Sequence, residues 1–541
     1  MASFSRRRNY LAGTACMLLA ACGGADDVAS PGAGNIDVIV TPAPTPSPTP
    51  TGTPTPTALT AAQFATATTV NSVTVTSEEQ LAIVNAGTNN NVNGFAGLNG
   101  VYPVSATSLT PAGNPATLGS FFQSTNFVGA TNGPTDTAFQ GWTCNSTSAN
   151  FGGTTAACTA VPAVGTGGSA AACPTGTTDD GIVATFRACR LPTVIASNLS
   201  LPKIPGVFYR FRGQTEVGTD IGSTATTGGV TLTIAAGVVM VADTSAGDSA
   251  NDLLLVNRGS RIVAVGTLAE PIVFTSQQNL TANGVSEATQ GQWGGLILLG
   301  QAPTAVCAAG TGPNNAGGTS TTCQNPIEGV AGRFYGGANQ ASDSGTLQYV
   351  QIRYTGIAIS EGNELQGLTL GGTGTGTTID HVQSHNSADD GVEIFGGTTN
   401  LRYFVVTGSD DDAFDVDNGW RGFMQYIIAA QKASGSTADS FATEIDSNNS
   451  EDLLPRTYGR YANFTFIQTT PSAPSAIRLR GGADFAFING VVKSAAGSTC
   501  LNIIAGEGSG DTRSTVRPAN EALQDVGRPT FNSVYFQCQG R

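Results

Sequence analysis

A repeat with a period of 22 residues most limits what this chain can fold into. Ile379, Leu401 and Phe423 each begin a similar apolar run, and successive runs start 22 residues apart. A second series has the same period, because the run DDGVEI from Asp389 matches the run DDAFDV from Asp411. A period of about 20 to 25 residues made of strands and tight turns indicates a solenoid, in which each coil buries its apolar face on its neighbours.

Short apolar runs earlier in the chain indicate strands, because they lack the spacing of an amphipathic helix and alternate with Gly, Asn, Thr and Asp. They include Leu232–Ile234, Leu253–Val256, Ile262–Val265, Ile272–Phe274 and Leu296–Leu299. Leucine-rich repeats need a leucine-dense consensus that is absent here, and a propeller blade is about twice as long. We therefore expect an all-β parallel β-helix over residues 206–493, with coils of about 22 to 25 residues.

Several longer segments carry a specific resemblance. They are LTIAAGVVMVAD, LLVNRGSRIVAVGTLAEPIVFTSQ, GQWGGLILLGQAP, DDGVEIFGGTTNLRYFVVTGSDDDAFDVDNGW and RGFMQYIIAAQ. Over residues 205–495 the chain resembles a family of exported, right-handed parallel β-helix proteins of Gram-negative bacteria, whose genes often lie near those of TonB-dependent outer-membrane receptors. The resemblance implies a right-handed β-helix at the cell surface, with a nutrient-uptake role and a receptor as partner. It carries over no catalytic residues.

The N-terminus has the pattern of an export signal. Arg6, Arg7 and Arg8 precede an apolar run, and the tetrapeptide LAAC ending at Cys22 resembles a bacterial lipobox. The resemblance implies that residues 1–21 are a lipoprotein signal peptide and that Cys22 is lipidated. Gly23, in place of Asp, then implies release to the outer membrane, with the cell surface as the expected location and the periplasmic leaflet left open. The alternative is an ordinary secretory peptide with a chance cysteine.

The remaining boundaries follow from composition. Residues 22–60 join the lipidated cysteine to a Pro/Thr-rich stalk, in which proline excludes helix and central strand. We expect residues 61–205 to form an irregular N-terminal cap over the open end of the solenoid, with a short helix near Leu81 after a capping box at Ser77. Residues 494–541 are expected to form a C-terminal coil or cap.

Eight cysteines remain besides Cys16 and Cys22, and they fall into neighbouring pairs. The pairs are Cys144 with Cys158, Cys173 with Cys189, Cys307 with Cys323, and Cys500 with Cys538. In an oxidising compartment this spacing predicts four local disulfides. Zinc is the alternative, but no CxxC motif occurs.

The formal net charge of −14 argues against a nucleic-acid partner, because the 24 Lys and Arg residues form no basic stripe. Cations or glycans are the ligands to expect instead.

The repeat places acidic side chains side by side, because residues at equal phase in adjacent coils lie about 4.8 Å apart. The expected neighbours are Asp389 with Asp411, Asp390 with Asp412, and Glu393 with Asp415. Asp410 and Asp417 add to the group, and Glu444 and Asp446 continue it on the next coil. Adjacent carboxylates repel unless a cation bridges them or a proton is retained, and such hard oxygen ligands favour Ca²⁺.

Two other interpretations of this acidic group stay open. Asp and Asn are ordinary turn residues, so the group could be solvated turns. It could also contain a catalytic carboxylate pair, as in polysaccharide lyases of this fold, which resemble such a picture with Ca²⁺ and a basic proton acceptor. The available bases are Arg402, Arg421, Arg478 and Arg480, each of which could instead pair with a neighbouring carboxylate.

His381 and His385 lie about 13 Å apart if the segment is extended, too far to share a metal, and we expect His381 to stack along the solenoid. Trp293, Trp420, Tyr354 and Tyr403 could bind sugars, but single aromatic residues in a solenoid more often fill its interior.

We expect a surface-displayed lipoprotein that binds an extracellular ligand, such as a glycan, or serves an outer-membrane receptor. The alternatives are a lyase or glycoside hydrolase that uses the carboxylates near 389–417, and a structural or adhesive surface protein. Fold alone does not choose among them.

Overall fold

The computed structural model describes most of the chain from residue 112 onward. The described residues are 112–132, 136–244, 251–308, 320–360, 363–432, 440–447, 452–470, 473–495, 498–503, 515 and 518–537. All of them belong to one compact unit, Pro54–Arg541. The predictions for the signal peptide, Cys22, the stalk and the helix near Leu81 lie outside the described residues.

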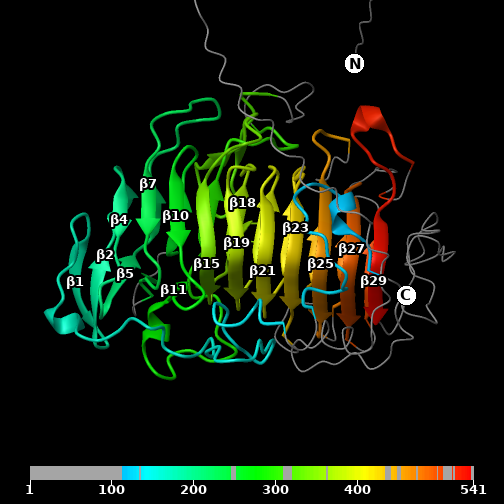
Figure 1. Ribbon diagram of the computed structural model, residues 1–541. Helices are drawn as coiled ribbons and strands as arrows, with labels where there is room; N and C mark the ends of the chain where they lie inside the picture. The colour runs from blue at the N-terminus through cyan, green and yellow to red at the C-terminus, as the bar shows by residue number, and fades with distance from the viewer. Residues whose placement is uncertain are drawn as a thin grey trace, which may run out of the picture. The chain divides into compact units, whose positions relative to one another are not determined.

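The chain winds into a right-handed parallel β-helix, as predicted (Figure 1). One face is a ten-stranded sheet in which each strand pairs in parallel with its counterpart in the next coil. From its N-terminal edge it contains β3 (Val194–Ile195), β6 (Gln214–Val217), β9 (Leu253–Val256), β12 (Leu296–Leu299), β18 (Leu368–Gly371), β20 (Val392–Phe395), β22 (Phe414–Asp417), β24 (Thr443–Ile445), β26 (Ser475–Leu479) and β28 (Thr499–Ile503).

Fifteen further strands form a larger sheet, which is parallel apart from the first hairpin, and two small antiparallel pairs stand apart from both sheets: β13 (Asn325–Pro326) with β14 (Phe334–Tyr335), and β16 (Ile357–Ser360) with β17 (Asn363–Leu365). The main path of the larger sheet contains β1 (Thr178–Val183), β2 (Phe186–Arg190), β5 (Val207–Phe211), β8 (Val239–Ala242), β11 (Ile272–Ser276), β15 (Gly345–Arg353), β19 (Thr378–His385), β21 (Asn400–Thr407), β23 (Phe423–Ala430), β25 (Tyr458–Gln468), β27 (Asp484–Ser494) and β29 (Thr530–Gln537). A branch contains β4 (Leu199–Leu201), β7 (Thr231–Ile234) and β10 (Arg261–Val265).

The branch arises because two strands of the early coils merge in the later coils. The first half of β15 pairs with β10 and its second half pairs with β11. At the junction the backbone of Tyr349 is left-handed, with φ of 53°. The same kink recurs in every later strand of this sheet, at His381, Tyr403, Tyr426, Asn463, Asn489 and Ser533. Each kink turns the chain from one face of the coil to the next.

The predicted register holds over two coils and then slips. Ile379 pairs with Leu401, and Val392 pairs with Phe414, both at the predicted spacing of 22 residues. Leu401, however, pairs with Met424 rather than with Phe423, because the turn before β23 is one residue longer. The predicted alignment of Asn463 with Asn489 is confirmed, since the residues on both sides of them pair.

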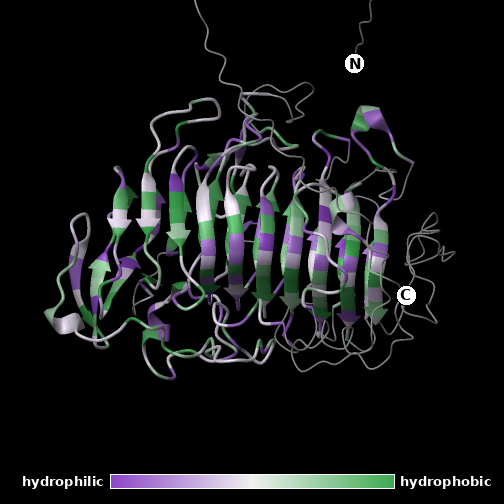
Figure 2. Ribbon diagram, viewed as in Figure 1, coloured by the Kyte–Doolittle hydropathy of each residue, from purple (hydrophilic) through white to green (hydrophobic). Residues whose placement is uncertain are grey.

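The core fills the interior of the coils, and Figure 2 shows hydrophobic residues recurring on successive strands. Trp293, Trp420 and Tyr354 are fully buried, which confirms that they fill the interior rather than bind sugars.

Residues 112–132 and 136–160, which we call the strap, do not cover the open end of the solenoid. They run along the outer face of the larger sheet, from β27 towards β15 (blue to cyan in Figure 1). Phe127, Phe139 and Trp142 pack there against outward apolar side chains such as Val405 and Ile428. For residues 112–132 and 136–160, the prediction of a cap over the open end is therefore wrong.

The solenoid also begins earlier than predicted. β2 already pairs in parallel with β5, and the antiparallel hairpin of β1 and β2 forms the N-terminal edge of the larger sheet. The described helices are short 3₁₀ turns, η3 (Pro115–Thr117), η4 (Gly168–Ala170), η5 (Gln277–Leu280) and η7 (Glu521–Leu523). None of these has the length and apolar character that crossing a membrane requires.

Three predicted disulfides are confirmed. Cys144 bonds to Cys158, Cys173 to Cys189, and Cys307 to Cys323, with Cα atoms 4.8, 5.4 and 5.1 Å apart. Cys500 is disulfide-bonded as well, while Cys538 lies outside the described residues.

Candidate cation-binding site

Acidic side chains follow one another on the outer face of the ten-stranded sheet. Glu393 lies in the middle of β20, and the apolar residues on either side of it pack in the core. Since side chains alternate along a strand, Glu393 faces outward, and so does Asp415 of β22. The register places Glu393 opposite Asp415, as predicted, and Asp415 opposite Glu444 of β24. Carboxylates on three consecutive strands thus share one row.

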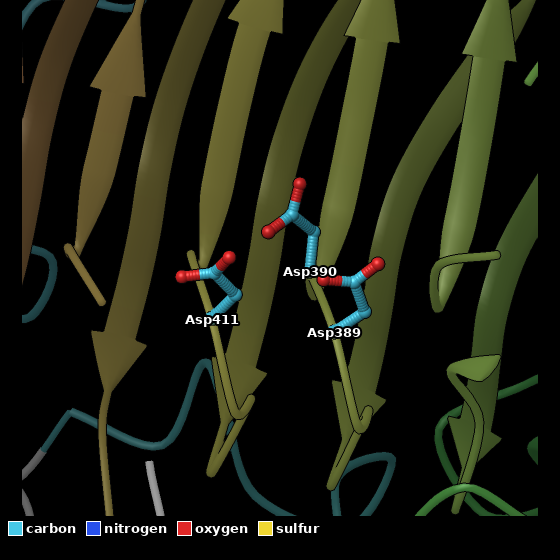
Figure 3. Close-up of side chains that lie close together, drawn as sticks. All are labelled: Asp389, Asp390 and Asp411. Atoms are coloured by element: carbon cyan, nitrogen blue, oxygen red, sulfur yellow. The ribbon is translucent and has the colours of Figure 1, made fainter. Parts of the chain in front are cut away.

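The turns before β20 and β22 bring further carboxylates to the same edge. Asp390 accepts a hydrogen bond from the backbone N–H of Asp412 at 2.9 Å, and Asp412 accepts one from the N–H of Phe441 at 2.6 Å. Each of these aspartates therefore fastens its own turn to the following coil. Figure 3 shows Asp389 and Asp390 on one turn with Asp411 on the neighbouring turn.

Five of the eight predicted ligands lie close enough to hold a cation. Carboxylate oxygens of Asp389, Asp390 and Asp411 lie within 4.8 Å of one another. The same limit holds for Asp390, Glu393 and Asp415, so Asp390 belongs to both groups. Two adjoining sets of three carboxylates are an arrangement that suits a hard divalent cation.

The other three predicted ligands are used elsewhere. Asp410 forms an ion pair with Lys432 at 3.2 Å and accepts a hydrogen bond from Gln290 at 2.9 Å. Asp412 holds the N–H of Phe441. Asp417 accepts from the N–H of Asn418 at 2.5 Å and belongs to neither group.

Burial makes these carboxylates costly to ionise. Desolvation, followed by the charge of Asp411, raises the pKa of Asp389 to about 8. Burial also raises the pKa of Asp390, Glu393 and Asp415 well above the ordinary range, and the neighbouring carboxylates raise each further. At neutral pH the group must retain protons or bind a cation, because like charges in a low dielectric repel strongly.

Two buried oxygens of this site have no hydrogen-bond partner among the described residues. They are Oδ2 of Asp389 and Oε1 of Gln366, whose Nε2 donates to Glu393 at 2.6 Å. A buried acceptor without a partner costs about 1 to 3 kcal/mol, which a bound cation would offset. The donor set of carboxylates and one amide oxygen therefore fits Ca²⁺.

Three members of the site were missed from the sequence. Glu328 lies in the segment between β13 and β14 and Glu364 in the short strand Asn363–Leu365, and the carboxylate of Glu328 accepts from the N–H of Glu364 at 2.9 Å. Both contribute to the raised pKa of Asp389. Gln366 had a usable signal, because it precedes the strand Leu368–Gly371 as Asp390 precedes β20.

The four arginines considered as bases divide into two kinds. Arg478 pairs with Glu444 at 3.3 Å, and Arg480 pairs with Glu444 at 2.8 Å and with Asp446 at 3.1 Å, as expected. Arg402 and Arg421 instead donate to backbone carbonyls, Arg402 to that of Phe121 at 2.6 Å. Pairing with carboxylates is therefore confirmed for two and wrong for two.

The histidines take no part in this site. His381 stacks between Tyr349 and Tyr403, with ring centroids 4.5 and 4.3 Å away, as predicted. Tyr403 belongs to the same stack and is partly exposed. His385 is buried against the hydroxyl of Thr407 at 2.8 Å, and burial lowers its pKa to about 3.

Comparison with known proteins gives one match. A family model described as a pectate-lyase-like β-helix domain matches residues 217–532, more than half of the 541 residues. No curated protein and no solved structure matches the chain.

Proposed function

Because the chain belongs to the family of pectate-lyase-like β-helix domains, we propose that it binds a polysaccharide and that Ca²⁺ on its ten-stranded sheet supports this binding. The fold is compatible with both polysaccharide-binding and polysaccharide-active proteins. The observation that carries the proposal is the pair of carboxylate groups around Asp390, whose oxygens lie within 4.8 Å and whose burial leaves them short of compensating charge. A cation held there still has coordination positions for sugar hydroxyl or carboxylate oxygens.

Binding is favoured over cleavage because the nearby basic groups are already engaged. Arg478 and Arg480 pair with Glu444 and Asp446, so neither is poised as a proton acceptor beside the carboxylate groups. Arg402 lies on the opposite sheet, against Phe121 of the strap. Cleavage by the carboxylates near 389–417 is the alternative that the experiments below distinguish.

We also propose that the protein is displayed from the outer membrane through lipidated Cys22. The support is the lipobox-like LAAC and the proline-rich stalk that follows it. In this setting the β-helix acts as a binding module, either alone or beside an outer-membrane receptor.

Calcium titration of the full-length protein tests the cation site. Isothermal titration calorimetry should detect Ca²⁺ binding in the wild type, and Asp390→Asn should weaken it roughly tenfold or more, because Asp390 belongs to both groups. Asp343→Asn is the matched control, since that partly exposed aspartate pairs with Arg261 at 2.7 Å in another coil. Equal affinities in wild type and Asp390→Asn would contradict the proposed site.

Incubation with a panel of polysaccharides tests the ligand. We expect retention of at least one polysaccharide with calcium and its loss in a chelator, with chain length unchanged. Shortened chains would show that the protein is an enzyme. If the protein retains no polysaccharide and a receptor is recovered with it from detergent-solubilised membranes, the ligand is a protein partner and not a glycan.

A further inference from the structure

A cavity lies where the ten-stranded sheet passes into the larger sheet. It has a volume of about 480 Å³, and its wall includes the turns after β20 and β22 at Gly397 and Gly419. Arg421, Arg460 and Gln524 contribute polar side chains to its lining. None of the carboxylates of the cation site lines it. A volume of this size can hold a small molecule or one sugar unit.

Arg460 is held in this cavity by aromatic rings alone. Its guanidinium carbon lies 3.8 Å from the centroid of the Phe423 ring and 4.4 Å from that of Tyr458. Its Nε is buried without a hydrogen-bond partner, and no described residue accepts a hydrogen bond from its guanidinium or forms an ion pair with it. The rings therefore hold the guanidinium in place, and its N–H donors have no acceptor among the described residues.

Arg421 also lies near Tyr458, with its guanidinium carbon 5.6 Å from the centroid of that ring. It donates to the carbonyl of Arg456 at 2.9 Å and to Gln524 at 3.4 Å, both neutral acceptors. Burial lowers the pKa of both arginines, and the charge of Arg421 lowers that of Arg460 further. The two guanidinium groups therefore lie near the same ring and repel each other.

The acids nearby do not neutralise this pair. Arg456 forms ion pairs with Asp452 at 2.6 Å and with Asp525 at 3.9 Å. Burial raises the pKa of Asp484, the acid that acts on Arg421, to about 8, so that this carboxyl is largely protonated at neutral pH. The cavity therefore carries positive charge on a protein whose formal net charge is −14.

We propose that this cavity binds a single oxyanion group of a ligand, a carboxylate or a sulfate ester, with Arg460 and Arg421 as its donors. Planar guanidinium groups match the paired oxygens of such groups, and partial burial strengthens the interaction. The site does not depend on calcium and does not depend on the proposed role of the carboxylate groups.

Titration of the full-length protein in a chelator, at constant ionic strength, tests the proposal. The probes are sodium glucuronate, inorganic sulfate and inorganic phosphate, with glucose as the neutral control. We expect glucuronate or sulfate to bind and glucose not to bind. A preference for glucuronate identifies a carboxylate site, and a preference for sulfate identifies a sulfate-ester site. Tighter binding of phosphate than of both would overturn the stated ligand class.

Arg460→Gln should weaken the preferred anion about tenfold, and Arg460→Lys should recover only part of the affinity, because lysine keeps the charge but not the planar donor face. Arg261→Gln is the matched control, an exposed arginine in an ion pair with Asp343. Equal losses in Arg460→Gln and Arg261→Gln would show non-specific attraction and overturn the site. If Arg460→Gln does not fold, Arg421→Gln is measured in its place. A thermal-shift measurement on the wild type is a second test, because a bound anion should raise its Tm, and an unchanged Tm would also overturn the proposal.

Discussion

A carboxyl group buried beside other carboxyl groups binds its proton more tightly in the folded chain than in the unfolded chain. Burial and neighbouring charges raise the pKa of Asp389 to about 8, and those of Asp417 and Glu328 to about 7. The folded state therefore holds more protons than the unfolded state up to this range, so its stability falls as the pH rises through it. His385 has the opposite sign, because its lowered pKa destabilises the folded state in acid.

We expect the Tm of the calcium-free protein to fall by several degrees as the pH rises from about 6.5 to about 8.5, because these carboxyls must ionise at close range. His385 is neutral in the folded state across this window, and in the unfolded state it loses its proton around its ordinary pKa of 6.5, so it opposes the fall only at the lower end. Calcium should remove most of the fall, since a cation stabilises the ionised form. Differential scanning calorimetry in chelator and in calcium measures both curves.

Asp484 needs a separate control, because burial raises its pKa to about 8 away from the cation site. The variant Asp484→Asn removes that contribution and should leave the calcium-sensitive part of the fall intact. A Tm that stays constant across the window in chelator would rule out the raised pKa values.

For single residues of the cation site, the sequence predicted those whose positions follow from the repeat. Asp389, Asp390, Glu393, Asp411 and Asp415 follow from the 22-residue period and meet as expected. Glu328 and Glu364 could not be predicted, because they lie in segments whose length bears no relation to the period. Asp410 was grouped wrongly with the ligands, because Lys432, which pairs with it, lies beyond the repeated run.

Among the elements, the kinked strands of the larger sheet hold the strap by side-chain amides. Asn489 at the kink of β27 accepts from the N–H of Gly113 and donates to its carbonyl, both at 2.8 Å. Gln383 of β19 bonds in the same two ways to the backbone of Cys144, at 2.6 and 3.1 Å. These amides take the place of a neighbouring strand, although the strap itself has little regular structure.

Asn489→Ala should loosen the N-terminal part of the strap. The change removes both bonds to Gly113 and puts alanine at φ of 56°, and we expect a loss of about 2 to 3 kcal/mol. Limited proteolysis with mass spectrometry should show faster cleavage between residues 112 and 132, and urea unfolding gives the free energy.

Asn489→Gly separates the two causes, because glycine tolerates the left-handed backbone but makes no side-chain hydrogen bonds. The protease should cleave this variant as fast as Asn489→Ala, but its free energy of unfolding should fall less. Unchanged cleavage in both variants would show that these bonds do not hold the strap.

The elements of the solenoid were predictable because strands and turns recur, whereas the slip between β21 and β23 was not. One additional residue in the turn before Phe423 moves the pairing of Leu401 to Met424 while leaving the apolar pattern almost unchanged. The strap escaped prediction for a related reason, since its apolar residues are single and irregularly spaced.

For the whole molecule, the predicted lipid anchor decides where the β-helix works. Cys22→Ser should move the protein from the outer-membrane fraction to the soluble periplasmic fraction, because the lipid is the anchor that the sequence predicts. Fractionation with immunoblotting measures this, and protease treatment of intact cells tells surface display from the periplasmic leaflet. A Cys22→Ser protein that remains in the outer-membrane fraction would contradict the predicted anchor.

The strap has a consequence for the order in which the molecule is completed. In a plain solenoid each coil can settle on the preceding one as soon as it is made. Here Gly113 meets Asn489, 376 residues later, and the apolar cluster beneath the strap extends to Tyr535. The segment near Gly113 can dock only after β27 has formed, whereas Phe127 packs on Tyr426 of β23 and Trp142 on Tyr349 and His381 of earlier coils. The strap can therefore dock fully only on a nearly complete chain, and a truncated chain leaves apolar side chains of the strap exposed to neighbouring molecules.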